Sequence, residues 1–494
     1  MDPLPAERFD PVRLTLGRAL FRGAGSGLYA RGGPVFQRLS RSGWGTVLKS
    51  TRHDPLPAAG RVAPAGRLLL ALLVFLATGC GLLAAPPNVI LIIADDQHWG
   101  DYGFMGHPAI RTPHLDRLSR EGLTFRHGYV PTSLCCPSLA SIITGRYPHQ
   151  HLITGNDPPR PKGIAADQFH SSEAFRLGRQ QMVKNLEAWP TLPRLLGQAG
   201  FRSLQTGKWW LGDYRHGGFS EGMTRGGRHG DAGLDIGRRT MEPVFDFMTQ
   251  SRAAGKPFFV WYAPMMPHDP HTPPERILAR HRGSAPSEAV AKYWAMVEWF
   301  DETCGAILDH LDREGLAENT LVVYVTDNGW ITDPKTGRFA PKSKQSPYDG
   351  GLRTPIMVRW KGHLTPRTSD IPVSSIDILP TILKACGVAA PPGLPGLDLT
   401  EEPALIARPA IHGECHTHDI MDLLKPEPNL RWRWIIREGW KLIVPAPQNE
   451  KGGVELYRLA DDPLEERNLA AADPVRVASL RASLDAWWSG RIHP

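Results

Sequence analysis

The sequence predicts an α/β fold, in which a large, mostly parallel β-sheet is sandwiched between helices and a smaller α+β subdomain follows at the C-terminus. Continuous apolar runs such as 88–94 and 320–326 are typical of strands buried on both faces of a parallel sheet. Segments with helical periodicity alternate with these runs, which indicates parallel strands joined by right-handed crossovers. With 494 residues, 41% of them hydrophobic, the chain can form one large domain and one small one.

The individual elements follow from apolar periodicity and from the residues that stop it. Strands are expected at 88–94, 123–125, 201–205, 257–262, 320–326 and 355–360, and helices at 114–121, 137–144, 191–198, 242–254, 286–313 and 375–386. Gly122, Gly145 and Gly200 end three of these helices. The polar, Pro- and Gly-interrupted segment 155–185 is expected to be an insertion, and the Gly-, Arg- and His-rich segment 213–240 a loop over a site.

The C-terminal part is expected to contain a hairpin, a further strand and a closing helix, after a Pro/Gly-rich link at 389–395. These elements are predicted at 433–436, 440–444, 455–459 and 474–488. We therefore divide the chain into an N-terminal extension with a signal peptide (1–85), a catalytic domain (86–400) and an α+β subdomain (401–494).

The end of the N-terminal extension has the layout of a bacterial secretory signal. Arg67 precedes a short apolar run that is followed by small residues, and the run is too short for a membrane span. Residues 76–80 loosely resemble a lipoprotein cleavage box with Cys80 as the lipidated residue, although Ala77 stands where Leu is usual; cleavage after Ala85 is the alternative. We expect an exported protein that is periplasmic, lipoprotein-anchored or secreted, whose true start lies downstream of Met1 because such signals normally begin a chain.

Charge and cysteine usage exclude two classes of function. Eleven of the 57 Lys/Arg residues and four of the 50 Asp/Glu residues lie in residues 1–67. The remainder of the chain therefore has 46 basic and 46 acidic residues. Since the basic surplus belongs to the prefix, nucleic-acid binding is not expected. The six cysteines show no CxxC pair and no zinc spacing, while a Cys386–Cys415 disulfide stays open.

Two polar pairs follow buried strands directly. Asp95 and Asp96 end the strand at 88–94, and Asp327 and Asn328 end the strand at 320–326. Ligand sites of α/β sheets lie at the carboxyl ends of the strands, and a buried acidic pair is costly without a cation. Because these groups offer oxygen ligands, they suit Ca²⁺ or Mg²⁺ rather than zinc.

Cys135 precedes Pro137 and an amphipathic run, so it is expected at a helix N-terminus. There the free N–H groups and the helix dipole stabilise negative charge, which suits a nucleophile acting on an anionic ester. A buried structural cysteine is the alternative.

Six pieces of the chain, in order, resemble the formylglycine-dependent (type I, arylsulfatase-like) sulfatases of the alkaline-phosphatase superfamily. They are the strand with Asp95-Asp96, the Cys-x-Pro-Ser box at 135–138 with Thr144-Gly145-Arg146, Thr206-Gly207-Lys208-Trp209, Pro267-His268, Thr326-Asp327-Asn328-Gly329, and Lys344 before Tyr348-Asp-Gly-Gly. The segment 456–468 is also similar to the C-terminal strand and turn of that family.

The resemblance implies a role for each of these residues. A maturation enzyme would oxidise Cys135 to formylglycine, whose hydrate attacks sulfur and later expels sulfate. Lys208 and Lys344 would hold sulfate oxygens, and His268 would donate a proton to the leaving oxygen. The implied ligands of Ca²⁺, with Mg²⁺ as the alternative, are Asp95, Asp96, Asp327, Asn328 and an oxygen of the formylglycine at Cys135.

Two positions depart from the family pattern. Leu139 stands where the family usually has an arginine that positions the nucleophile and is read by the maturation enzyme. Trp210 stands where a histidine commonly assists sulfate release, and tryptophan cannot take a proton. The histidines that could replace it are His149, His151, His216 and His271, and the sequence selects none of them.

The sequence thus predicts a sulfuric ester hydrolase (sulfatase) that acts on a sulfated carbohydrate or an aryl sulfate. A phosphoester or phosphonate-ester hydrolase of the same superfamily and a silent module that binds sulfated glycans are the alternatives. The expected partners are a sulfated small molecule or glycan and the maturation enzyme, with no nucleic acid, and with a membrane only through a lipid anchor at Cys80.

Overall fold

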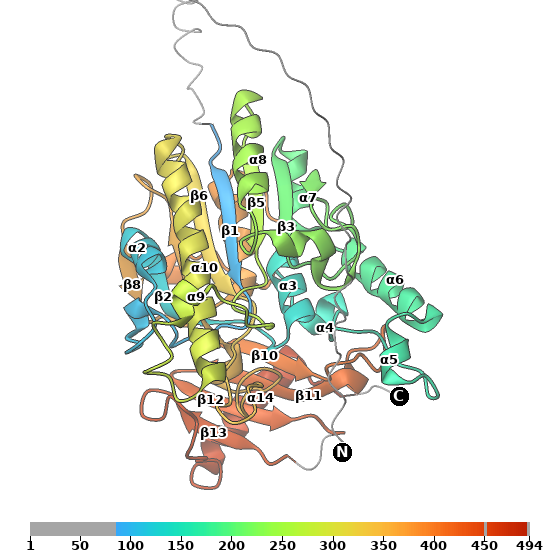
Figure 1. The fold of residues 1–494 in the computed structure, drawn as a ribbon. Helices are drawn as coiled ribbons and strands as arrows, with labels where there is room; N and C mark the ends of the chain where they lie inside the picture. Colours follow the sequence, from blue (N-terminus) through green and yellow to red (C-terminus); the bar gives the residue numbers. More distant parts are fainter. Residues whose placement is uncertain (1–84, 449–451, 492–494) are drawn as a thin grey trace, which may run out of the picture. The chain divides into compact units, whose positions relative to one another are not determined.

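The computed structural model describes residues 85–448 and 452–491, which form a large mixed sheet flanked by helices and a small antiparallel sheet (Figure 1). The predicted α/β fold class with a C-terminal α+β part is confirmed. The expected signal peptide and Cys80 lie outside the described residues. None of the helices in 85–448 and 452–491 has the length and apolar character needed to span a membrane.

The larger sheet has the strand order β4-β3-β5-β1-β6-β7-β2-β8, with β9 paired to β2. Its strands are β1 (Asn88–Ala94), β2 (Leu123–Tyr129), β3 (Arg202–Gly207), β4 (Glu221–Gly222), β5 (Phe258–Ala263), β6 (Thr320–Thr326), β7 (Arg353–Arg359), β8 (Arg367–Ser369) and β9 (Val373–Ser374). All pairings are parallel except those of β7, which runs antiparallel to β6 and β2. The sheet is therefore mostly parallel, as predicted.

The central strand β1 is buried along its whole length because both faces of the sheet are covered. Val89, Leu91 and Ile93 belong to one hydrophobic core, and Ile90 and Ile92 to the other, as the period of two in a strand requires. The first core includes side chains of α3 (Cys135–Thr144), α7 (Leu192–Gln198) and α12 (Ile378–Ala385). The second includes side chains of α2 (Pro113–Glu121), α8 (Glu242–Ala253) and α10 (Glu288–Arg313).

The C-terminal sheet is antiparallel in the order β10-β11-β12-β13. Its strands are β10 (Ile411–His416), β11 (Leu430–Arg437), β12 (Trp440–Pro445) and β13 (Glu455–Arg458). Helix α14 (Pro474–Trp487) covers it through a core that joins Leu480 and Leu484 to Ile435 and Leu442. The predicted hairpin, third strand and closing helix are all present.

The remaining elements are short, apart from one helix that the sequence did not reveal. They are α4 (Pro148–His151), α5 (Ala166–Phe169), α6 (Glu173–Glu187), α9 (Glu275–Leu278), α11 (Asp349–Leu352), α13 (Glu402–Ala407) and the 3-10 segments η1 (Gly103–Met105), η2 (Arg228–Asp235), η3 (Ser375–Asp377) and η4 (Glu427–Asn429). Helix α6 begins inside the expected insertion 155–185 and extends two residues beyond it. Cys386 and Cys415 are free, so the disulfide left open by the sequence is not formed.

Candidate active site

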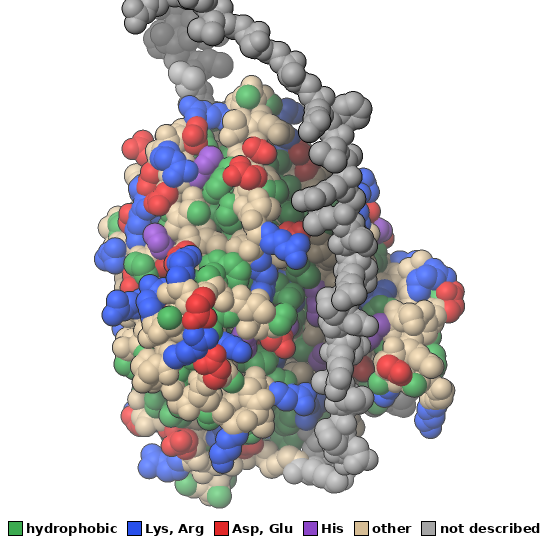
Figure 2. Space-filling model, in the orientation of Figure 1, with side chains coloured by type: hydrophobic (Ala, Val, Ile, Leu, Met, Phe, Trp, Pro, Cys, Tyr) green, Lys and Arg blue, Asp and Glu red, His purple; other side chains and the backbone are tan. Residues whose placement is uncertain are grey.

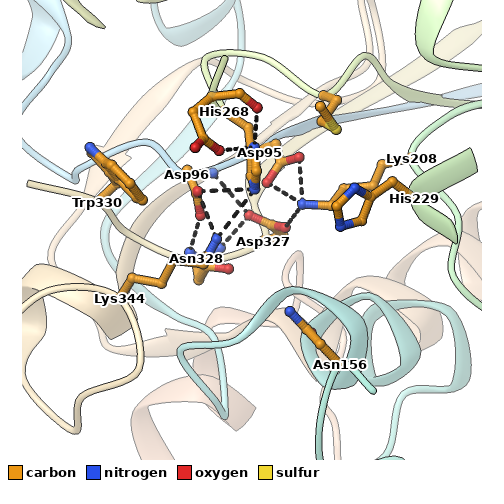
Figure 3. A network of polar contacts seen from close by, with 12 residues as sticks. Asp95, Asp96, Asn156, Lys208, His229, His268, Asp327, Asn328, Trp330 and Lys344 are labelled. Carbon is orange, nitrogen blue, oxygen red and sulfur yellow. Dashed lines mark hydrogen bonds and ion pairs between the residues drawn. The ribbon is translucent and has the colours of Figure 1, made fainter. Parts of the chain in front are cut away.

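Four neighbouring strands of the larger sheet, β3, β5, β1 and β6, deliver polar side chains to one edge (Figure 3). The side chains just beyond their carboxyl ends are Lys208 after β3, His268 after β5, Asp95 and Asp96 after β1, and Asp327 and Asn328 after β6. All six residues are buried. Residues far apart in sequence thus meet because their strands are adjacent in the sheet.

Two buried lysines pair with the carboxylates of this edge. Lys208 Nζ lies 2.6 Å from Asp95 Oδ1 and 3.8 Å from Asp327 Oδ2. Lys344 Nζ, from the loop between β6 and β7, lies 2.7 Å from Asp96 Oδ2. Gly207 directs Lys208 into the site from a φ of 74°, and a Cβ there would lie 1.8 Å from the carbonyl oxygen of Ala263.

The oxygen atoms of Asp327 and Asn328 are only partly used by the protein itself. Asp327 Oδ1 accepts the backbone N–H groups of Asp96 and Asn328, whereas Asp327 Oδ2 accepts no hydrogen bond. Asn328 Nδ2 donates to Asp96 Oδ1 at 2.6 Å, and the buried Asn328 Oδ1 has no hydrogen-bond partner. A buried oxygen without a partner costs stability unless something else, such as a cation, binds it.

The charges at this edge also fit a hard cation. Burial, together with the neighbouring charges of Asp95 and Cys135, raises the pKa of Asp327 well above its usual value. Ligand atoms of Asp95, Asp96, Cys135 and His268 lie within 4.8 Å of one another. Because a divalent cation would let all three carboxylates ionise together, the residues present suit Ca²⁺ or Mg²⁺.

His268 lies between these groups. Its Nδ1 is 2.6 Å from the carbonyl oxygen of Asp269, and its Nε2 is 3.4 Å from both Lys344 Nζ and Asp96 Oδ2. Burial and Lys208 lower the pKa of His268, but the carboxylates of Asp95 and Asp96 outweigh them and raise it to about 10. His268 therefore carries a proton at neutral pH in this charge environment.

Cys135 is the first residue of α3, at the helix N-terminus where the sequence placed it, and it is fully buried. Burial raises the pKa of its thiol, but Lys208 and Lys344 outweigh burial and lower it to about 7. The first turn of α3 is held by Asn156, whose Oδ1 accepts the N–H of Cys136 at 2.9 Å. Leu139 turns into the hydrophobic core and does not reach the polar groups of the site.

The loop carrying Lys344 is tied to the segment before Cys135. The N–H of Gln345 donates to the carbonyl of Ser133 at 2.9 Å, and Ser133 Oγ donates to the carbonyl of Ser346 at 2.7 Å. These bonds fix one lysine of the site relative to the start of α3.

A cavity of about 250 Å³ opens onto this site, and it contains residues that the sequence did not identify. Its lining comprises Asn156, Trp210, Arg228, His229, His268, Asp269, Trp330, Gly337, Arg338, Phe339, Lys344, Gln345 and His418. Arg228 and His229 begin η2 and Asn156 lies in a loop, and no local sequence pattern marks them as site residues. The only signal for Arg228 and His229 was the expectation that 213–240 covers a site, and Asn156 lies in the expected insertion 155–185.

His229 lies next to Trp210, which stands at the position where the family commonly has a histidine. Its ring centroid lies 4.3 Å from that of Trp210 and 6.1 Å from that of His268. Burial, Lys208 and Arg228 lower the pKa of His229 to about 2, so its imidazole is neutral. Its carbonyl accepts the N–H of Trp209 at 3.0 Å, which holds the loop against the end of β3.

None of the four histidines proposed from sequence lines this cavity. His149 bonds Glu414, and His151 Nε2 lies 3.0 Å from Ser141 Oγ. His216 bonds Asp213, and His271 packs against Tyr293 and Trp330. The structure brings His229 to the site instead.

Comparison with known proteins agrees with this geometry. The sulfatase family profile matches residues 87–388. The chain is 30% identical to N-acetylgalactosamine-6-sulfatase of Canis lupus familiaris over 66% of this chain and 68% of the relative, and 29% identical to arylsulfatase A of Homo sapiens over 67% and 70%.

Solved structures show the same fold. A structure of Ps i-CgsB in complex with k-i-k-neocarrahexaose superimposes with a TM-score of 0.65 at 22% identity, covering 82% of this chain and 94% of that one. Phosphonate monoester hydrolase of Agrobacterium radiobacter gives a TM-score of 0.60 at 20% identity, covering 81% and 96%. With its family profile, relatives and site in agreement, the chain belongs to the sulfatase family and is a sulfuric ester hydrolase.

Proposed function

We propose that this sulfatase hydrolyses the sulfate ester of a sulfated carbohydrate with a formylglycine made from Cys135 and a bound Ca²⁺. The observation that carries the proposal is the pair of buried carboxylates Asp95 and Asp96 within 4.8 Å of Cys135, together with the buried oxygens of Asp327 and Asn328 that have no hydrogen-bond partner. These oxygen ligands suit a hard divalent cation such as Ca²⁺, with Mg²⁺ as the alternative.

The four oxygen-bearing side chains and residue 135 hold the cation, which neutralises and polarises the sulfate group when bound. A formylglycine at position 135 supplies a hydrated aldehyde as nucleophile, and this can release sulfate afterwards without hydrolysis of a stable ester. The start of α3 favours negative charge at this position, since its N–H groups and dipole point toward it.

Lys208 and Lys344 bind the sulfate oxygens and stabilise charge that develops during attack. Both lysines are already fixed by carboxylates, so little reorganisation is needed when the substrate arrives. His268 donates the proton from Nε2 to the leaving oxygen, and the contact of its Nδ1 with Asp269 orients the ring. The neutral His229 can accept a hydrogen bond on the cavity side.

A sulfated carbohydrate is the substrate class that the similar proteins favour. One relative is an N-acetylgalactosamine-6-sulfatase, and one solved neighbour holds a neocarrahexaose. Aryl sulfates then serve as surrogate substrates. We further propose export, with maturation of Cys135 by a formylglycine-generating enzyme; anchoring through Cys80 is part of the same proposal.

Mass spectrometry of the peptide that contains Cys135 tests the mechanism. The protein is produced in a host that has the maturation enzyme. We expect the peptide to have the mass of the aldehyde form instead of the thiol form. An unmodified thiol in protein that nevertheless hydrolyses sulfate esters would contradict the formylglycine assignment.

Release of sulfate or phosphate from 4-nitrophenyl esters separates the two hydrolase classes. We expect faster hydrolysis of the sulfate ester than of the phosphate ester or a phosphonate monoester. The reverse order would favour the phosphonate-ester alternative, which shares this fold. Binding of sulfated glycans without any ester hydrolysis would favour the silent module that Leu139 and Trp210 suggested.

A further inference from the structure

A second and larger cavity, of about 800 Å³, lies beside the catalytic cavity. It is lined by α6, the residues just before it and parts of the 213–240 segment. Helices α5 and α6 project from the part of the fold that contains the large sheet (Figure 1). Arg228 lines both cavities, so the two adjoin at this side chain.

One face of α6 forms the wall of this second cavity. Most of the lining residues on the helix recur at spacings of three or four, and they are Glu173, Phe175, Arg176, Arg179, Gln180, Val183, Lys184 and Glu187. This spacing places them along one side of the helix. Since α6 has 15 residues, the wall is about 22 Å long, which exceeds what a single sugar needs.

Arg179 offers an unused donor at the inner end of this wall. Its guanidinium lies 5.6 Å from the ring centroid of Trp210, and its Nη1 donates to the carbonyl of Asn156 at 3.3 Å. Its Nη2 is buried and has no hydrogen-bond partner. Burial lowers the pKa of Arg179, which reflects the cost of keeping this charge away from water. A buried guanidinium N–H without a partner suits an oxyanion.

The cavity also has cations that no carboxylate neutralises. Arg228 pairs with Asp157 at 2.8 Å, and Arg176 pairs with Glu173. Within 85–448 and 452–491, neither Arg179 nor Lys184 has an ion-pair partner. On the face drawn in Figure 2, basic and acidic side chains are interspersed. The cavity is lined by four Lys/Arg and two Glu, and Arg179 and Lys184 are left without an ion-pair partner among the described residues, which favours a negatively charged ligand.

We propose that the second cavity binds an oxyanion, a sulfate or a carboxylate, on a sugar next to the one whose sulfate ester is hydrolysed. The substrate is then an anionic oligosaccharide or polysaccharide rather than a single sulfated sugar. Arg179 and Lys184 bind the second oxyanion, and Arg228, held by Asp157, separates the two subsites. This inference rests on the proposed sulfatase function.

Inhibition of 4-nitrophenyl sulfate hydrolysis by oligosaccharides of two lengths tests the proposal. The probes are carrageenan oligosaccharides, which carry sulfate, oligogalacturonates, which carry carboxylate, and neutral maltohexaose. We expect the hexamer of at least one charged series to inhibit tenfold or more strongly than its dimer, because each charge-assisted hydrogen bond contributes about 1.5–3 kcal/mol. The series that shows this gain identifies the oxyanion.

The ratio of hexamer to dimer inhibition is then compared within each variant, so that changes in activity cancel. The double variant Arg179→Gln/Lys184→Gln should lose the tenfold ratio, and Lys184→Gln, which alters only an exposed side chain, should lose part of it. Lys162→Gln is the matched control, an exposed lysine of the same insertion that lines neither cavity, and it should keep the ratio.

Equal inhibition by hexamer and dimer in the unaltered protein, or by charged hexamers and maltohexaose, would overturn the inference. A ratio that persists in the double variant would overturn it as well. Failure of the proposed sulfatase function gives a different result from failure of the subsite: protein that carries the aldehyde would then not hydrolyse 4-nitrophenyl sulfate. Calorimetric binding of the same hexamers to the Cys135→Ala variant tests the cavity in that case, with the same expected loss on Arg179→Gln/Lys184→Gln.

Discussion

Some polar atoms of the site accept hydrogen bonds from the protein, and others have no hydrogen-bond partner. Asp327 shows both in one side chain, because Oδ1 accepts two backbone N–H groups while Oδ2 accepts none. A cation bound at Oδ2 would therefore leave the hydrogen bonds of Oδ1 intact. Asp327 thus carries one oxygen that holds the backbone and one that is available to a metal ion.

Replacing Asp327 by Ala should abolish the response of the protein to Ca²⁺. A ligand at a hundred times its dissociation constant stabilises the native state by about 2.7 kcal/mol, so Ca²⁺ should raise the melting temperature of the unaltered protein. The Asp327→Ala variant should show neither this rise nor Ca²⁺-dependent sulfate release. Asp246→Ala, at an exposed carboxylate of α8, should retain both. Unchanged activity of Asp327→Ala after chelation and Ca²⁺ addition would contradict the metal assignment.

His229 should matter for turnover although it belongs to no family motif. It lines the catalytic cavity with His268 and Lys344, and a hydrogen bond from a reacting group to its neutral imidazole contributes about 1.5–3 kcal/mol, which is about 10-fold to 10²-fold in rate. We expect His229→Ala to lower kcat on 4-nitrophenyl sulfate by about that factor, whereas His363→Ala, outside both cavities, should not. Steady-state kinetics on the folded variants measure kcat. A wild-type kcat in His229→Ala would show that His229 takes no part in the reaction.

At the scale of elements, the start of α3 depends on a side chain outside the helix. Its N-cap residue Leu134 makes no side-chain cap, and Asn156 accepts the N–H of Cys136 instead. The sequence placed Cys135 correctly at a helix N-terminus, since Pro137 and the apolar periodicity are local signals. It could not supply Asn156, because that residue reaches α3 through a loop whose path depends on the tertiary structure.

Asn156→Ala should destabilise the protein by about 1 kcal/mol, the usual cost of losing a helix cap. Chemical denaturation measures this change, and Asn156→Asp, which keeps an acceptor oxygen, should recover most of it. Equal stability of Asn156→Ala and the unaltered protein would show that water replaces the cap. A lowered kcat in Asn156→Ala would in addition link the first turn of α3 to turnover.

The strand ends of the sheet were predictable from sequence, and two other features were not. Asp95, Lys208 and Asp327 follow buried strands, and buried strands have a local apolar signature. The antiparallel direction of β7 leaves no such signature. Helix α6 was missed partly because Gly178 suggests a break, although a Cβ there would lie 2.2 Å from the Cβ of Pro158, so that glycine allows close packing.

At the scale of the whole described fold, a buried ion group connects the C-terminal sheet to the catalytic loop. Lys441 Nζ, from β12, lies 2.8 Å from both Asp349 Oδ1 and Glu465 Oε1, and all three side chains are buried. Asp349 opens α11, five residues after Lys344. The proposed boundary at 400/401 therefore separates two parts that share a charged core, and we expect residues 86–400 alone to fold poorly.

Lys441→Met should destabilise the whole protein by about 3–5 kcal/mol, because it leaves two carboxylates buried without their cation. Burial already raises the pKa of Glu465 to about 7 despite the attraction of Lys441. The double variant Lys441→Met/Glu465→Gln should recover part of the loss, and Lys425→Met, at an exposed position of the same subdomain, should cost little. Denaturation midpoints measure each step, and a stable Lys441→Met single variant would contradict the coupling of the two parts.

The complete burial of Cys135 sets an order of events for the life of the chain. An enzyme that oxidises this side chain has to reach it before α3 docks on the sheet. The central pairing of β1 with β6 joins residues as distant as Asn88 and Thr320, and such long-range pairing forms slowly.

Synthesis thus leaves a period in which the thiol is accessible, and this period ends when folding is complete. We expect the maturation enzyme to convert Cys135 in chains that are refolding from denaturant and to leave the folded thiol protein unchanged, as mass spectrometry can show. Efficient conversion of the folded protein would mean that α3 opens locally. If conversion is confined to unfolded chains, a variant that folds faster would yield less active enzyme, and the activity would depend on the folding rate as well as on the final structure.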